Sequence, residues 1–207
     1  MRIEEHATAP IEALSQRARI SPNSVAFAVG DDRWKYAQLA KQAERVARGL
    51  VGRGLRKGER VALHMPNRPE FIVAVYACFH LGAVAVPLND KLAAAELMPM
   101  LQQLRPALYI GDADLYCLVD EIDCSILPRE KRVIVGDMGE VKGVQPWASL
   151  LSAGPLNNGS APLPVTADVH SPAVLLATPG KTGVPRFVTH TQATLAALFG
   201  LPFLCGH

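Results

Sequence analysis

The sequence lacks the patterns that mark a metal centre, a disulfide scaffold or a membrane protein. Four cysteines and six histidines occur among its 207 residues, but they form neither a C-x-x-C pair nor the His/Cys spacing of a zinc site. We therefore expect no structural metal, and we interpret the cysteines as reduced and buried. No apolar run approaches the roughly 20 residues that cross a bilayer, so we expect no membrane span.

An excess of charge of one sign is also missing. The 21 basic and 19 acidic residues leave a net charge of +2, which does not favour nucleic acid as a partner. The N-terminus, MRIEEHATAP, carries acidic side chains where a secretory signal has an apolar segment, so we expect a cytoplasmic protein. Acidic residues such as Asp112 and Asp114 lie at turn-like positions, and we assign no general acid or base among them.

Basic residues are concentrated in one local stretch. No aromatic side chains lie between its charges, which argues against stacking on single-stranded nucleic acid. Its arginines suit the outer face of a predicted helix, and we interpret them as a solvated face. The stretch consists of Arg45, Arg48, Arg53, Arg56, Lys57 and Arg60.

Short apolar runs, typical of strands, alternate along the sequence with segments whose apolar residues have the spacing of a helix. Hydrophobic residues make up 49% of the chain, which is enough for a substantial core. Apolar runs separated by helices indicate a mostly parallel sheet with helices on both faces, so we predict an α/β fold. The predicted strands are residues 25–29, 60–65, 83–88, 107–110, 132–136, 172–178 and 186–190. The predicted helices are 36–50, 93–104, 112–120, 147–151 and 191–200, with a buried helix near Pro69.

Local chemistry predicts several helix ends. Gly52 and Gly54 follow the helix at 36–50, because glycine tolerates the left-handed turn after a C-terminus. Asn67 and Glu70 have the spacing of a capping box, and Pro69 suits the first helical turn.

A change in composition divides the chain. Residues 154–171 are rich in Gly, Pro, Asn and Ser, which indicates a loop or linker. We predict an N-terminal α/β region over residues 1–153 and a linker over 154–171. Residues 172–207 then supply a strand, a glycine-bearing loop, a second strand and the start of a helix that belong to the same domain.

The glycine-bearing loop lies in the segment LLATPGKTGVPRFVTHT, residues 175–191. Its glycines allow backbone N–H groups to turn towards an anion, and its hydroxyl and cationic side chains suit phosphate oxygens. A plain glycine turn with ordinary surface charge is the alternative. The candidate phosphate-binding residues are Thr178, Gly180, Lys181, Thr182, Gly183 and Arg186.

The loop does not fit the P-loop motif of nucleotide-binding proteins. That motif requires a glycine five residues before Gly180, where this chain has Leu175. It also requires a helix directly after Thr182, whereas Pro185 and an apolar run follow.

The loop resembles instead the phosphate-binding loop of the adenylate-forming enzymes, which include acyl-CoA synthetases, luciferases and nonribosomal-peptide adenylation domains. Their signature is approximately T-S-G-[ST]-T-G-x-P-K, followed by an apolar strand that ends in Thr-His. An upstream region is also similar, from a helix through "GERVALHMPNRPEF" to "GAVAVPLN". The resemblance covers residues 11–194 in the family's order. The matching loop positions are Thr178, Gly180, Thr182, Gly183, Pro185, Arg186, Thr189 and His190.

This loop departs from the family's signature at two positions. Pro179 replaces a small residue and removes one potential N–H donor. Lys181 replaces a hydroxyl residue, and Arg186 keeps the charge of the usual lysine in a forked geometry.

The resemblance implies the N-terminal part of the large domain of an adenylate-forming enzyme. In that family, ATP with Mg²⁺ and a carboxylic acid give an acyl-adenylate, and a thiol such as coenzyme A then takes the acyl group. The family's other catalytic parts lie beyond this loop, so no catalytic residue is assigned and we expect the 207 residues to be inactive alone. A non-catalytic module that binds a nucleotide or a partner, and a structural remnant, are the alternatives. A homo-oligomer or a partner chain would cover the apolar C-terminus.

Overall fold

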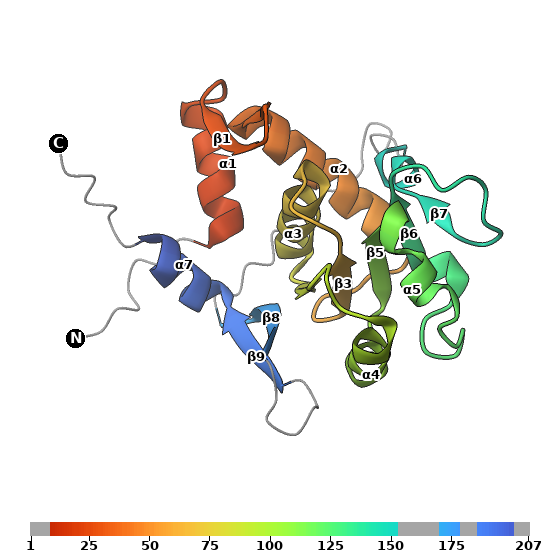
Figure 1. Cartoon of the computed structure of the whole chain (residues 1–207). Helices are drawn as coiled ribbons and strands as arrows, with labels where there is room; N and C mark the ends of the chain where they lie inside the picture. Colours follow the sequence, from red (N-terminus) through yellow and green to blue (C-terminus); the bar gives the residue numbers. More distant parts are fainter. Residues whose placement is uncertain (1–8, 153–169, 179–185, 201–207) are drawn as a thin grey trace.

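The computed structural model describes residues 9–152, 170–178 and 186–200, and it confirms the predicted α/β fold (Figure 1). The first half contains α1 (Pro10–Ile20), β1 (Val25–Val29), β2 (Asp32–Lys35), α2 (Tyr36–Gly52), β3 (Arg60–His64), α3 (Pro69–Leu81), β4 (Val84–Leu88) and α4 (Ala94–Leu104). The second half contains β5 (Leu108–Asp112), η1 (Ala113–Leu115), α5 (Cys117–Asp120), η2 (Arg129–Lys131), β6 (Arg132–Val135), β7 (Gln145–Pro146), α6 (Ala148–Leu151), β8 (Pro172–Thr178), β9 (Arg186–Thr191) and α7 (Gln192–Gly200).

The main sheet has seven strands in the order β7-β6-β5-β3-β4-β8-β9. All neighbouring strands are parallel except β8 and β9, which form an antiparallel pair. The mostly parallel sheet is therefore confirmed. Because β8 and β9 belong to this sheet, they extend the same layer as the earlier strands. Of the predicted linker at 154–171, only His170 and Ser171 are among the described residues, so the linker stays a prediction.

Strand β2 was not expected from the sequence. It pairs with β1 in a separate antiparallel hairpin that turns at Gly30, where φ is +58°. Only Trp34 of β2 is half-buried, and it stacks on Phe27 with ring centroids 5.6 Å apart. A four-residue strand with one inward side chain leaves too short a pattern to detect.

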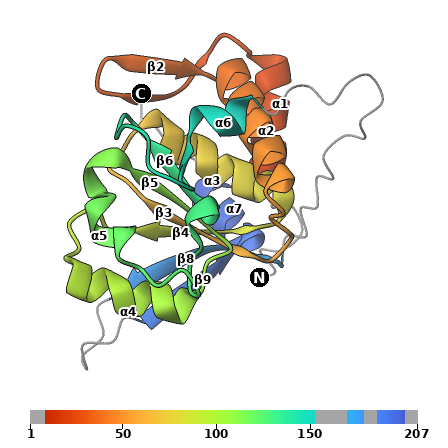
Figure 2. The same cartoon turned by 90° about the vertical axis from the view of Figure 1, so that its right-hand side faces the viewer.

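Helices cover both faces of the sheet, as Figure 2 shows most clearly. On one face, α1, α2, α3 and α6 pack against alternate strand residues such as Val61 and Leu63. On the other face, α4 and the segment around α5 pack against the intervening residues, such as Ala62 and Tyr109. The period of two along each strand thus builds two hydrophobic clusters with one sheet between them.

The predicted capping box at Asn67 and Glu70 is wrong. Arg68 is the N-cap of α3, with extended backbone angles, and its Nε donates to Glu70 at 2.8 Å. Pro69 is the first helical residue, as expected, and Gly82 ends the helix in the left-handed region. The carboxylate of Glu96 accepts from the Ala93 N–H instead, which satisfies an N-terminal donor of α4.

A buried arginine organises the segment between β5 and β6. Arg132 is fully buried, and its guanidinium donates to backbone carbonyls at 2.8 to 3.2 Å. The carbonyls belong to Val119, Asp120, Ile122 and Leu127. Two of them lie at the C-terminal end of α5, where carbonyl groups lack helical partners. The cation therefore fixes this irregular segment against the sheet through carbonyl dipoles.

The basic stretch is only partly the solvated face that we expected. Three of its guanidinium groups are half-buried and donate to atoms far away in sequence. Arg45 bonds the Leu151 carbonyl at 2.7 Å, Arg53 the Ser149 hydroxyl at 2.6 Å and Arg60 the Leu104 carbonyl at 2.6 Å. Leu151 and Leu104 are the last residues of α6 and α4, where arginine satisfies free carbonyls.

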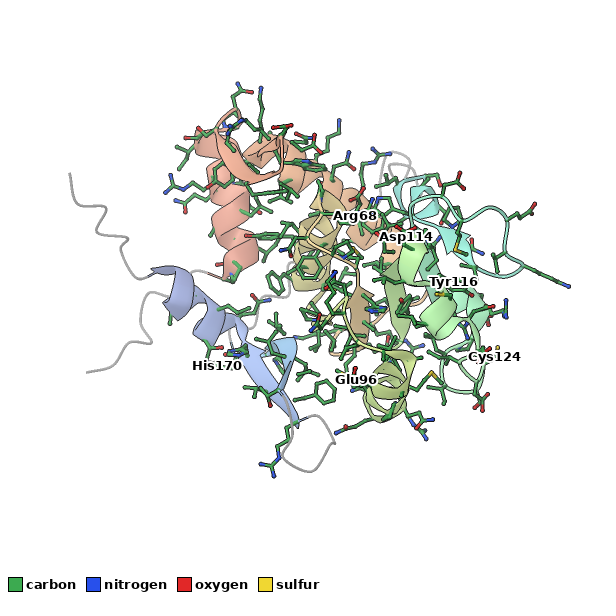
Figure 3. All side chains as sticks on the ribbon, in the orientation of Figure 1. Arg68, Glu96, Asp114, Tyr116, Cys124 and His170 are labelled. Carbon is green, nitrogen blue, oxygen red and sulfur yellow. The ribbon has the colours of Figure 1, made fainter. Side chains whose placement is uncertain are left out.

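The interpretation of the cysteines as buried is confirmed for one of them. Cys78 is buried in α3, and burial raises the pKa of its thiol to about 12. Cys117 and Cys124 are exposed, because only one side of the short α5 segment packs inward. Figure 3 shows Cys124 on the outside of this segment. Cys205 lies outside the described residues.

The described residues also bear on metal binding and on membrane crossing. Across residues 9–152, 170–178 and 186–200, no three His, Cys, Asp or Glu side chains group in a way that suits a metal ion. In that part of the chain, no helix combines the length and apolar character that a bilayer crossing requires.

The contact between α2 and α6 leads to a stability prediction. A Cβ atom on Gly49 would lie 2.7 Å from Cα and 2.9 Å from the carbonyl carbon of Leu150. Because these are backbone atoms, we expect Gly49→Ala to lower the free energy of unfolding by roughly 1–3 kcal/mol in urea denaturation. Gly52→Ala is the matched control, since a Cβ there meets nothing within 4 Å. Equal effects of the two substitutions would contradict the close contact.

Candidate functional site

The parallel strands bring their carboxyl ends to one edge of the sheet. The last residues of β3, β5 and β8 are His64, Asp112 and Thr178. The chain passes from β3 through α3 to β4 on one side, and α4 then returns it to β5 on the other side of β3. Strand order therefore changes direction beside β3, the position at which open α/β sheets bind ligands.

Two candidate phosphate-binding residues flank the base of the glycine-bearing loop. Thr178 ends β8, Arg186 begins β9, and the two are partners in the antiparallel register. The Thr178 hydroxyl donates to the Arg186 carbonyl at 3.2 Å, and both residues are exposed. Gly180, Lys181, Thr182 and Gly183 lie outside the described residues, so the phosphate site as a whole stays a prediction.

The elements around the loop agree with the exclusion of a P-loop. Leu175 lies within β8, and the loop is followed by strand β9. The helix begins only after Thr191, whose hydroxyl accepts from the Thr194 N–H at 3.2 Å. Thr191 therefore caps the helix predicted at 191–200, and His190 is a half-buried residue of β9.

An ion pair that sequence reasoning missed joins the carboxyl ends of β3 and β5. Arg68, four residues after β3, approaches Asp112 Oδ2 with its Nη1 at 2.5 Å. Oδ1 of the same carboxylate accepts from the Asp114 N–H at 3.0 Å, and Figure 3 shows Arg68 and Asp114 near the same end of the sheet. Both carboxylate oxygens of Asp112 thus have partners. The only sequence signal was the position of these polar residues after apolar strands.

A second missed pair lies beneath this edge. His64 is fully buried, and its Nδ1 lies 2.9 Å from the hydroxyl of Tyr109 in the neighbouring strand. The Tyr109 ring folds over Gly111, where a Cβ would overlap it. Burial lowers the pKa of His64, although Asp90, the Asn89 backbone and Asp112 act in the opposite direction. The neutral form of the imidazole is therefore favoured, and its Nδ1 either accepts from or donates to the Tyr109 hydroxyl, depending on the tautomer.

A hollow of about 280 Å³ opens between the ends of β3 and β4. Its lining combines apolar side chains with amide and carboxylate groups, and the exposed lining is more polar than apolar. A larger hollow, of about 860 Å³, is lined by Ile134 and the segment from Gly136 to Pro146, beside β6 and the edge strand β7. The smaller hollow is lined by Met65, Pro66, Asn67, Phe71, Pro87, Leu88, Asn89 and Asp90.

Comparison with known proteins gives a consistent result. The family model described as "AMP-binding enzyme" matches residues 14–202. The long-chain-fatty-acid–CoA ligase FadD13 of Mycobacterium tuberculosis is 33% identical over 88% of this chain and 35% of its own length. A crotonobetaine/carnitine–CoA ligase of Escherichia coli is 30% identical over 79% of this chain and 32% of its own. The chain spans about a third of the length of these curated relatives.

Solved structures agree in fold. A protein assigned as a long-chain-fatty-acid–CoA ligase from Rhodopseudomonas palustris has a TM-score of 0.80 at 25% identity, over 94% of this chain and 47% of its own. The N-terminal domain of FACL13 from Mycobacterium tuberculosis has a TM-score of 0.68 at 29% identity, over 89% of this chain and 44% of its own. The similarity therefore concerns the N-terminal portion of these proteins.

The buried His64 leads to a prediction on pH. Its folded pKa lies below the ordinary value of 6.5, so protons favour the unfolded chain. The contribution of neutral His64 to the free energy of unfolding is fully present above pH 6.5. It is lost as the pH falls from 6.5 towards the pKa of His64 in the folded protein, by about 1.4 kcal/mol for each unit between the folded and unfolded pKa. We expect His64→Gln to flatten this decline in urea denaturation.

His80 serves as the comparison for that measurement. It lies on α3, and burial also lowers its pKa. His80→Gln should remove only the contribution of His80 to the pH dependence of stability and leave that of His64 in place. If the His64→Gln protein lost stability with falling pH in the same way as the wild type, the lowered pKa of His64 would be contradicted.

Proposed function

Because the chain belongs to the AMP-binding enzyme family, we propose that it forms the N-terminal part of an ATP-dependent acyl-CoA ligase. One observation supports this most directly. Thr178 and Arg186 are exposed on either side of a loop at the carboxyl edge of a parallel sheet, in a segment that lies within the family match. A hydroxyl and a guanidinium at that position suit the phosphate groups of a nucleotide.

In this proposal, the residues of the loop bind the β- and γ-phosphates of ATP in its Mg²⁺ complex. Arg186 and Lys181 offset negative charge, and the hydroxyl of Thr182 donates to phosphate oxygens. Gly180 and Gly183 leave room for backbone N–H groups to face the anion. Thr178 already donates to the Arg186 carbonyl, so its role is also to hold the two ends of the loop together.

The reaction that we propose for the complete enzyme has two steps. A carboxylate oxygen bonds to the α-phosphorus of ATP while pyrophosphate leaves, and the sulfur of coenzyme A then bonds to the acyl carbon while AMP leaves. A fatty acid is the substrate that we favour, since FadD13 aligns with 88% of this chain. Within the chain, Arg186 and Lys181 would stabilise the pyrophosphate as its charge develops.

The 207 residues by themselves are proposed to be inactive, since they match about a third of the curated relatives. A non-catalytic module that binds a nucleotide or a partner chain is the second candidate, because Pro179 removes an N–H from the loop. A structural remnant that binds nothing is the third. The cytoplasmic location, the homo-oligomer and the partner chain over the apolar C-terminus stay predictions.

Calorimetry with ATP·Mg²⁺ tests the role of the loop. We expect Arg186→Ala to weaken binding by roughly tenfold to a hundredfold, since it removes a charge-assisted hydrogen bond worth about 1.5–3 kcal/mol. Lys181→Ala should weaken it less, and Lys142→Ala, an exposed lysine elsewhere, should leave it unchanged. No binding heat in any of these proteins would favour the structural remnant.

A pyrophosphate-release assay with ATP and a mixture of acyl acids tests completeness. We expect no turnover by the 207-residue chain, because the family's other catalytic parts lie beyond the loop. Turnover sensitive to Arg186→Ala would support the nucleotide site and show that the assumption of incompleteness is wrong.

A further inference from the structure

Cationic side chains from three separate segments converge at the amino edge of the sheet, opposite the candidate site. We call this group the amino-edge cluster. In Figure 2, α2 runs along one side of the molecule to the edge where β3 begins. The cluster consists of Arg53, Arg56, Lys57, Arg60, Arg105 and Lys131.

Backbone and side-chain hydrogen bonds tie the first two segments together. Arg60 is the first residue of β3, and its carbonyl accepts from the Ala107 N–H at 2.8 Å. Its Nε also donates to the Leu104 carbonyl at 2.6 Å. Arg105 lies between these two partners in the sequence and is exposed, so its backbone lies beside the start of β3.

The third segment joins through a lysine. Lys131 Nζ donates to the Arg53 carbonyl at 2.5 Å and lies 3.8 Å from the Cβ position of Gly54. Arg56 and Lys57 follow in the turn before β3, and both are exposed. Residues 53–60, 105 and 131 therefore lie along one edge of the sheet, although they are far apart in the sequence.

The cluster is not neutralised by the protein. None of the six cations makes an ion pair with a carboxylate in the part of the chain that the structure describes. Glu59 and Glu130 are the acidic residues within its segments, and Glu59 accepts from the Arg56 backbone N–H. Arg129, next to Lys131, is excluded because it pairs with Asp120 at 3.0 Å.

One exposed apolar side chain lies near the end of α2. Val51, two residues before Arg53, is 46% exposed at the end of α2. The cluster contains no aromatic residue, which a single-stranded nucleic acid would use for stacking. It also lacks the apolar centre of a typical protein interface.

We propose that the amino-edge cluster binds an anionic membrane surface. Cations spread along one edge suit lipid headgroups, where each Lys or Arg near the surface contributes about 1 kcal/mol. The carboxyl edge with the candidate site then faces away from the bilayer. This proposal does not depend on the nucleotide site.

Sedimentation of the 207-residue chain with lipid vesicles tests the proposal. We expect binding to vesicles of equal parts phosphatidylglycerol and phosphatidylcholine, and none to phosphatidylcholine alone. High salt should release the protein, because it screens exposed charges. The double variant Arg56→Glu/Lys57→Glu changes exposed residues whose side chains form no hydrogen bond or ion pair within the described residues. It should bind the anionic vesicles at least about tenfold more weakly than the wild type.

Arg33→Glu/Lys142→Glu is the matched control, with the same change in net charge at exposed positions outside the cluster. It should keep most of the binding, and circular dichroism should show that both variants fold. Absence of wild-type binding to the anionic vesicles, or an equal loss in the control, would overturn the proposal. Tighter binding to a DNA duplex than to vesicles at the same salt would overturn it in favour of nucleic acid.

Discussion

The structure depends on the crossover that each pair of parallel strands requires. Because parallel strands cannot be joined by a tight turn, the chain returns from β3 to β4, from β4 to β5 and from β5 to β6 through helical segments on the faces of the sheet. The carboxyl ends of β3, β4, β5, β6 and β8 therefore meet at one edge, and their amino ends at the other. The first edge carries the candidate site, and the second carries the cationic cluster.

Cations bonded to backbone carbonyls stabilise this framework at several places. Arg132 does so within the α5 segment, and Arg45 and Arg60 do so at the ends of α6 and α4. A guanidinium has five N–H donors in a fixed arrangement, so one side chain can satisfy several carbonyls. Figure 1 shows that α4 and α6 lie on opposite sides of the sheet, so this interaction anchors both covering layers.

The candidate site combines residues that differ in how well the sequence predicts them. Thr178 and Arg186 were predicted, because a continuous motif of the family surrounds them. The Arg68–Asp112 and His64–Tyr109 pairs were not, since 44 and 45 residues separate their members. No local pattern reports a contact between two strands that adjoin only after a helix has crossed over. The exposure of Cys117 and the strand β2 were not predicted for a related reason. Both depend on which side of a short element faces the core, and a short element leaves no clear pattern.

The sequence by itself determined the fold class, the family, the run of strands and helices, and the position of the glycine-bearing loop. These features depend on periodicity and on continuous motifs, which are local properties of the chain. Only the tertiary structure decided the strand order, the buried His64–Tyr109 pair, the arginines that bond helix ends, and the meeting of Arg60, Arg105 and Lys131 at one edge. Each of these depends on packing between segments far apart in sequence, where burial and geometry select one arrangement among many compatible with the same pattern.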